Sequence, residues 1–157
     1  MLTKEGSTVF LRRVRTGQLR LLAVRQFALI LQAEVAKGRT FDCIITSDAE
    51  LQRLNRTFRG KDCPTDVLSF PCGPKPLLLH NTHLGDIAIS YQRARAQARE
   101  IGHTLEQEIY VLMLHGVLHL MGMDHETDNG QMARAEARYR RVLGLPFALT
   151  ERGQESV

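Results

Sequence analysis

The chain has 157 residues, of which 43% are hydrophobic and 24% are charged, and its formal net charge is +4. This composition is typical of an ordinary soluble globular protein, and we expect a single domain spanning residues 1–157. Three cysteines without a Cys-x-x-Cys pair argue against a disulfide framework and favour a reducing cytoplasm. The mild basic excess permits a polyanionic partner without establishing one.

The sequence contains no apolar segment suited to a membrane. Its longest apolar stretch, from Leu19 to Ala36, is interrupted by polar or charged side chains at Arg20, Arg25, Gln26, Gln32 and Glu34. Such a stretch predicts an amphipathic helix and cannot span a bilayer. The N-terminus lacks the apolar run and cleavage site of a secretion signal, so we expect a cytoplasmic protein without a membrane partner.

Hydrophobic periodicity predicts strands and helices that are interleaved along the chain. In chain order, the expected elements are a strand over Thr8–Val14, a helix over Gln18–Ala36, a strand over Phe41–Thr46, a helix from Asp48 to about Phe58, a strand over Val67–Phe70, a loop from Cys72 to His83, a strand over Leu84–Ser90, and helices over Tyr91–Ile101, Thr104–Met121 and Asp128–Leu143. Together they predict an α+β fold with a small mixed sheet of about four strands covered by helices.

Local signals place the ends of two of these helices. Ser47 or Asp48 can cap the helix that runs to Phe58. Thr104 and Gln107 form the pattern of a capping box at the start of the next-to-last helix. We expect that helix to be central and to pack against the sheet.

The most informative motif lies at the end of this central helix. His115 and His119 are four residues apart, so both imidazoles leave the same helical face about one turn apart. Gly122 can end the helix in a left-handed conformation and turn the chain so that His125 reaches the same side. Three converging imidazoles predict a catalytic type of zinc site holding one ion, with a fourth position left for water. Nickel, copper or iron could occupy the same ligands.

The residue after the first histidine limits the chemistry. The histidine and glycine offsets equal those of the metzincin peptidases, whose motif places a glutamate general base where this chain has Gly116. Without that carboxylate, proton transfer to an amine leaving group lacks its usual agent, so a peptide bond is a poor substrate. Phosphodiester cleavage instead needs stabilisation of negative charge, which a metal or an arginine supplies.

Two aspartates are candidates for supporting the metal site. Asp124 directly precedes His125 and could accept a hydrogen bond from a ligand histidine, act as a base on the bound water, or simply be a turn residue. Asp86, in a Leu-Gly-Asp segment read as a turn, could accept the second ring nitrogen of a ligand histidine, or could simply cap its turn.

Three blocks of the sequence together resemble the YbeY family of bacterial endoribonucleases, also called rRNA maturation factors. They are Leu54-Asn55 through Arg59 to Pro64-Thr65-Asp66-Val67-Leu68-Ser69-Phe70-Pro71, then Leu84-Gly85-Asp86-Ile87 continuing to Ser90, and then His115-Gly116 through His119-Leu120 and Gly122 to Asp124-His125. The resemblance implies a zincin-like α+β domain that cleaves single-stranded RNA with one zinc ion. It also implies a role in 16S rRNA 3′-end maturation and in ribosome quality control.

The resemblance also implies roles for individual residues. His115, His119 and His125 match the metal ligands, and Arg59 matches a functional arginine beside the metal. Arg59 could hold a scissile phosphate, although its position alone also suits an exposed helix end.

Arg53 and Arg56 lie on the same helical side as Arg59 and are candidates for binding an RNA backbone, with a solvated face as the alternative.

The leading interpretation is therefore a zinc-dependent endoribonuclease whose partners are single-stranded RNA and a ribosomal RNA precursor or the small ribosomal subunit. One alternative is a zincin-type metallopeptidase or amidohydrolase, and another is a non-catalytic zinc-stabilised ribosome-assembly module. The sequence does not reveal the oligomeric state, and a monomer is compatible with it.

Overall fold

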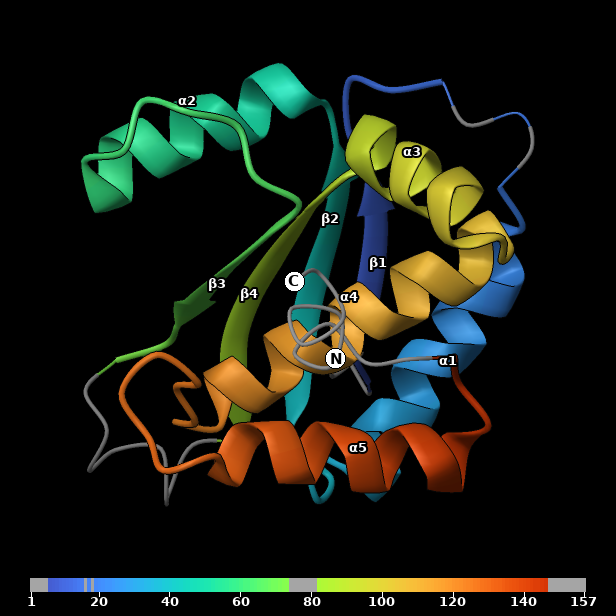
Figure 1. Cartoon of the computed structure of the whole chain (residues 1–157), viewed down its shortest axis with the longest axis vertical. Coiled ribbons are helices and arrows are strands. Elements are labelled where there is room, and N and C mark those ends of the chain that lie inside the picture. The colour runs from blue at the N-terminus through green and yellow to red at the C-terminus, as the bar shows by residue number, and fades with distance from the viewer. Residues whose placement is uncertain (1–5, 16, 18, 74–81, 147–157) are drawn as a thin grey trace, which may run out of the picture.

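The structure, a computed structural model, describes residues 6–15, 17, 19–73 and 82–146. Its elements are β1 (Thr8–Leu11), α1 (Leu21–Glu34), β2 (Thr40–Thr46), α2 (Asp48–Arg59), β3 (Val67–Pro71), β4 (His83–Ser90), α3 (Tyr91–Ile101), α4 (Leu105–Leu120) and α5 (Gln131–Leu143). Figure 1 shows the sheet at the centre, with α4 crossing it and α5 lying against the outer side of α4.

The α+β fold class expected from the sequence is confirmed. The four strands form one sheet in the order β1-β2-β4-β3. The first three pair in parallel, and β3 runs antiparallel along the edge. The sheet is therefore mixed, as the interleaving of strands and helices predicted.

Each face of the sheet has its own apolar contacts. The face that carries Phe41, Cys43 and Ile87 belongs to the main core, where α4 packs against β3 and β4 and α1 packs against α4. The opposite face carries Ala88, which packs with Leu51 of α2 in a smaller cluster. Because side chains alternate along a strand, neighbouring residues of β4 serve these two different environments.

Three boundaries differ from the expectations by three residues, and the others by no more than two. The first strand ends at Leu11 rather than Val14, and Arg13 just beyond it has a φ of 56°, a left-handed conformation that ends an extended strand. The first helix begins at Leu21, and Gln18 lies outside the described residues. The last helix begins at Gln131 because the preceding residues form a turn that ends at Gly130, whose φ is 88°.

The expected loop from Cys72 to His83 is described only at its ends, because residues 74–81 lie outside the described ranges. At its far end, His83 already belongs to β4. The strand expected over Leu84–Ser90 is confirmed, and the interpretation of Leu84-Gly85-Asp86 as a turn is wrong, because all three residues lie within this strand. Gly85 makes the reading understandable, since its φ of +145° is a conformation that favours glycine.

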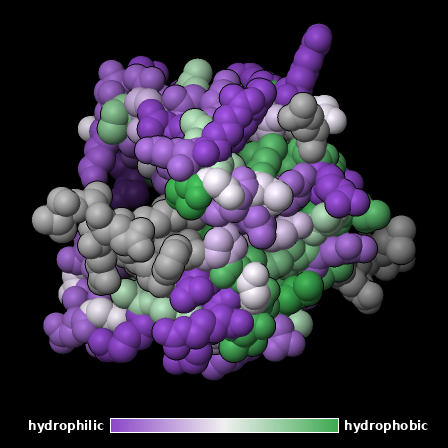
Figure 2. Space-filling model, turned by 45° about the vertical axis from the view of Figure 1, so that its right-hand side comes forward, coloured by the Kyte–Doolittle hydropathy of each residue, from purple (hydrophilic) through white to green (hydrophobic). Residues whose placement is uncertain are grey.

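Surface composition differs between parts of the molecule. Figure 2 shows mostly hydrophilic side chains along the upper part, where Figure 1 places α2 and α3. On α2, Arg53, Arg56 and Arg59 are all exposed. Within the described parts of the chain, no helix has the length and apolar character needed to cross a membrane.

Candidate metal centre

The helix that carries the first two histidines is strongly anchored. Thr104 caps α4 and forms the expected capping box with Gln107, which satisfies backbone N–H groups at the helix start. Most of the helix is buried between the sheet and the helices α1, α3 and α5. His115 and His119 therefore project from a rigid element, which is the support a metal site requires.

The chain reverses immediately after α4, as the sequence predicted. Gly122 has a φ of +95° and donates its N–H to the carbonyl of His119 at 2.9 Å. The next residue, Met123, donates to the carbonyl of Leu118 at 3.1 Å. These bonds close the helix end and direct the chain so that His125 comes back to the other two histidines.

The three imidazoles do converge. Their ring centroids lie 4.7 Å apart for His115 and His119, 5.1 Å for His115 and His125, and 5.3 Å for His119 and His125. Ligand nitrogens from all three rings lie within 4.8 Å of one another, which is close enough to contact one ion. Burial falls from His115, which is buried, to the exposed His125, so the site opens to solvent on one side.

Protonation also suits a metal at this position. Burial, together with the neighbouring His115 and His125, lowers the pKa of His119 from 6.5 to about 4. The ring is therefore neutral near pH 7 and has a lone pair available for a cation. Three imidazole ligands with an open side fit zinc held by three histidines.

A buried glutamate supports the first ligand, and the sequence interpretation missed it. The Nδ1–H of His115 donates to the carboxylate of Glu136, and both side chains are almost completely buried. This contact leaves Nε2 of His115 for the metal side of the ring. The available signal was a glutamate on the apolar face of α5, next to Ala135 and between Met132 and Tyr139.

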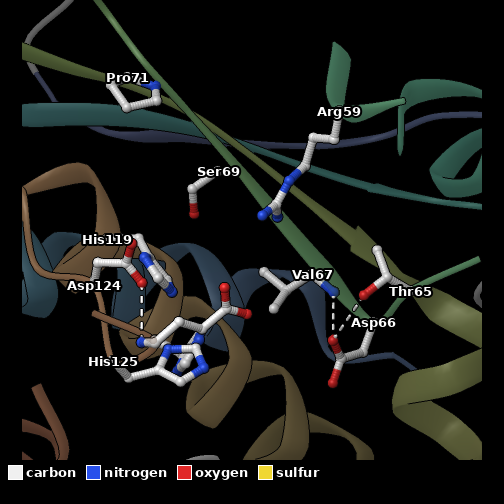
Figure 3. A pocket seen from close by; sticks show the side chains of 11 residues that line it. Arg59, Thr65, Asp66, Val67, Ser69, Pro71, His119, Asp124 and His125 are labelled. Atoms are coloured by element: carbon white, nitrogen blue, oxygen red, sulfur yellow. Dashed lines mark hydrogen bonds between the residues drawn. The ribbon is translucent and has the colours of Figure 1, made fainter. Parts of the chain in front are cut away.

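Arg59 faces the histidines across a cavity of about 370 Å³. The cavity is lined on one side by the edge strand β3 and on the other by the end of α4 and the turn after it. Figure 3 shows the Arg59 side chain reaching from α2 toward the side where His119 and His125 lie. The fold thus places a cation-binding group and a permanent positive charge on opposite walls of one open cavity.

Asp124 lines the same cavity, but its hydrogen bonds are those of a turn. Its Oδ1 accepts the N–H of Glu126 at 3.0 Å, and its backbone carbonyl accepts the N–H groups of Thr127 and Asp128. The bond from Glu126 is the main reason why the pKa of Asp124 is lowered, with the nearby His119 and His125 adding to the effect. These contacts fit the turn-residue alternative and hold His125 in place.

The remaining candidates are not brought to the histidines. Asp86 lies on the opposite face of the sheet, grouped with Asp42 and His83. Arg53 forms a two-pronged ion pair with Glu50, and Arg56 lies 3.7 Å from a carboxylate oxygen of Asp62. Neither arginine lines the cavity.

Comparison with known proteins agrees with this geometry. The family model described as "Endoribonuclease YbeY" matches residues 12–144. The chain belongs to the YbeY family. A relative from Solibacter usitatus named endoribonuclease YbeY is 59% identical over 154 residues, covering 98% of this chain and 99% of the relative. Another from Chloroflexus aurantiacus is 45% identical over 141 residues, covering 80% and 87%.

A solved structure is similar as well. The solution structure of TM1509 from Thermotoga maritima matches with 30% sequence identity and a TM-score of 0.57. The match covers 87% of this chain and 89% of the TM1509 chain. YbeY membership confirms the resemblance on which the sequence interpretation relied, and it places the chain among endoribonucleases, hydrolases that act on RNA.

Proposed function

We propose that this YbeY-family chain is, as one domain, a zinc-dependent endoribonuclease that cleaves single-stranded RNA in ribosomal RNA precursors, including the 3′ end of 16S rRNA. The observation that carries the proposal is that the three histidines and Arg59 lie on opposite walls of one open cavity. The histidines are His115, His119 and His125. Its substrate is in the cytoplasm, where an exposed thiol such as that of Cys63 also remains reduced.

The ligand set supports zinc as the ion. Three imidazoles form the set and leave an open position toward solvent, which is the arrangement of catalytic zinc sites. When bound, zinc supplies a Lewis acid that stabilises negative charge on a phosphoryl oxygen. Glu136 holds the ring of His115 in the tautomer that leaves Nε2 free, and the turn at Asp124 holds His125.

Arg59 binds the scissile phosphate in this proposal. A guanidinium donates two parallel hydrogen bonds to phosphate oxygens and keeps its charge at any pH the protein encounters. Its position opposite the histidines places the phosphate between two positive groups. Charge that develops on the phosphoryl oxygens is then stabilised from both sides.

The cavity shape supports a single strand as substrate. It is an open trough between the edge strand β3 and the turn after α4, with Thr65, Ser69 and Pro71 on the β3 side. A phosphodiester must enter between Arg59 and the histidines with its bases directed elsewhere. An unpaired strand bends into such a trough more easily than a stiff duplex does.

The test compares wild type with Arg59→Ala, His115→Ala and the control Arg56→Ala. Arg56 is an exposed arginine on the same helix but does not line the cavity. We expect Arg59→Ala to retain zinc and its melting temperature but to lose about 100-fold or more in cleavage of an unstructured RNA. His115→Ala should lose zinc and cleavage together, and Arg56→Ala should stay within a few-fold of wild type.

Two results would contradict the proposal. Undiminished cleavage by Arg59→Ala would remove its assigned role, and cleavage that survives complete metal removal would remove the metal. A non-catalytic assembly module would show zinc binding with no cleavage by the wild type. For the ribosomal substrate, cells that carry only Arg59→Ala should accumulate 16S rRNA with an unprocessed 3′ end.

A further inference from the structure

A second group of metal-ligating side chains lies on the other face of the sheet. Asp42 of β2 and Asp86 of β4 are register partners on adjacent parallel strands, so their side chains emerge on the same face. Their neighbours Cys43 and Ile87 point into the main core on the α4 side, which places the two carboxylates on the opposite face. We call Asp42 and Asp86 the carboxylate pair. Like charges directly opposite each other on neighbouring strands repel.

An irregularity in β4 brings a histidine to the carboxylate pair. The register shifts between the partners Thr40–His83 and Phe41–Gly85, so Leu84 is an extra residue on β4. In a strand with regular alternation, His83 would lie on the opposite face from Asp86, because the two residues are three positions apart. Bulges redirect side chains in this way. As a result, Nε2 of His83 lies 3.7 Å from Oδ2 of the β2 carboxylate.

The hydrogen bonds of His83 leave Nε2 directed at the carboxylate pair. Its Nδ1 lies 2.8 Å from Oγ1 of Thr40, and that hydroxyl lies 3.3 Å from the carbonyl of Thr82, to which it donates. Nδ1–H then donates to Thr40, which leaves Nε2 as the ring nitrogen that can bind a cation. At 3.7 Å the contact with Asp42 is too long for a hydrogen bond.

We propose that Asp42, His83 and Asp86 form a second cation site, for a divalent first-row metal such as Mn²⁺ or Zn²⁺. One ligand atom from each residue lies within 4.8 Å of the others, as one shared ion requires. Two carboxylates and one imidazole suit such an ion, and remaining positions go to water. Thr40 orients the imidazole and Thr8 holds Asp42 through its hydroxyl, which are the supports that ligands of bound metals have.

The ion would link two adjacent strands of the sheet. It neutralises the repulsion within the carboxylate pair and ties β2 to β4 at the end of the sheet where β4 begins. All three side chains are partly or fully exposed, so an ion from solvent can reach them. The site lies on the opposite face from the three histidines of the metal centre and does not depend on the function proposed for them.

The experiment loads the full chain with one equivalent of zinc and then titrates Mn²⁺, with free Mn²⁺ measured by electron paramagnetic resonance. Zinc stays at the three-histidine centre because imidazole ligands bind it far more tightly than Mn²⁺. We expect one Mn²⁺ per wild-type chain. His83→Gln and Asp86→Asn should each weaken its binding at least tenfold, and the control Glu100→Gln, an exposed carboxylate on α3, should not.

A second readout guards against misfolded variants. Mn²⁺ should raise the melting temperature of wild type and Glu100→Gln but not that of the two site variants, since the ion binds only the folded chain. His115→Ala, titrated with Mn²⁺ alone, should still bind one ion. No wild-type binding up to about 1 mM, the weak limit of protein cation sites, would overturn the proposal. So would unchanged binding by either His83→Gln or Asp86→Asn.

Discussion

Glu136 on α5 accepts the Nδ1–H of His115 on α4, and neither side chain has appreciable contact with solvent. The bond joins two helices that would otherwise meet through apolar contacts such as those of Met132. It directs one ring nitrogen of the first metal ligand away from the cavity and leaves the other for the ion. A buried carboxylate thus becomes part of the metal centre without touching the metal.

Replacing Glu136 with glutamine should weaken zinc binding by about 10–100-fold, because the neutral amide is a weaker acceptor for the His115 N–H. A chelator competition assay measures the affinity directly. The control is Glu126→Gln, which removes a carboxylate that lines the cavity but pairs with none of the three imidazoles. If both variants lose affinity equally, nearby negative charge matters and the specific hydrogen bond does not.

Gly116 is tightly packed at the position where zincin peptidases have a glutamate. A Cβ there would lie 3.0 Å from both Cδ1 and Cγ2 of Ile87, which is fully buried. We expect Gly116→Ala to lower the free energy of unfolding by about 1–3 kcal/mol in urea titrations. Gly116→Glu should be worse and should acquire no peptidase activity, since its side chain meets β4.

The control is the same change in an Ile87→Val background, which removes Cδ1. Gly116→Ala should cost less there than in wild type, because the two side chains then compete for less space. Equal costs in both backgrounds would show that Ile87 is not the obstacle.

Gly85 is required by both its conformation and its surroundings. Its φ is +145°, and a Cβ would lie 2.2 Å from the backbone oxygen of Phe70. Gly85→Ala should destabilise the fold by about 3 kcal/mol or more, measured by urea unfolding. Gly102→Ala is the control that separates backbone strain from the steric clash with Phe70. Gly102 also has a positive φ, +86°, but a Cβ there would meet no atom within 4 Å. The control should therefore destabilise the fold by only about 1 kcal/mol. A similar loss of stability at both positions would contradict the steric clash at Gly85.

Arg53 stabilises the fold through Glu50. Its Nε donates to Oε2 of Glu50 at 2.9 Å, and this pairing lowers the pKa of the buried carboxyl, with Arg13 and Arg12 adding positive charge. The unfolded chain therefore takes up the proton first as the pH falls, so the stabilisation is present above pH 4.5 and disappears below the folded pKa.

Arg53→Met should lower the free energy of unfolding near neutral pH, and the difference from wild type should shrink in acid as Glu50 becomes protonated. Urea titrations at about pH 7 and about pH 3 measure both values. RNA cleavage should change by no more than a few-fold. Weaker RNA binding with unchanged stability would instead place Arg53 on the path of the RNA.

Short-range patterns in the sequence predicted much of this protein. The cap at Thr104 was predicted and is confirmed, and of the two caps considered for α2, Ser47 and Asp48, the structure has Ser47. The turn at Gly122 and the gathering of the three imidazoles also follow from local geometry, because a helix repeats every 3.6 residues and a glycine readily adopts a positive φ. All these features lie within about ten residues of chain, where backbone geometry decides the outcome.

Contacts between distant elements depended on the tertiary structure. Glu136 lies on a different helix from His115, and the face of the sheet on which His83 lies depends on one extra residue in β4. Asp86 looked like a partner for the histidines but lies on the other face. Spacing along the chain determined which side chains share a helix face, whereas the packing of helices and strands decided which of those faces meet, because that packing depends on every side chain between them.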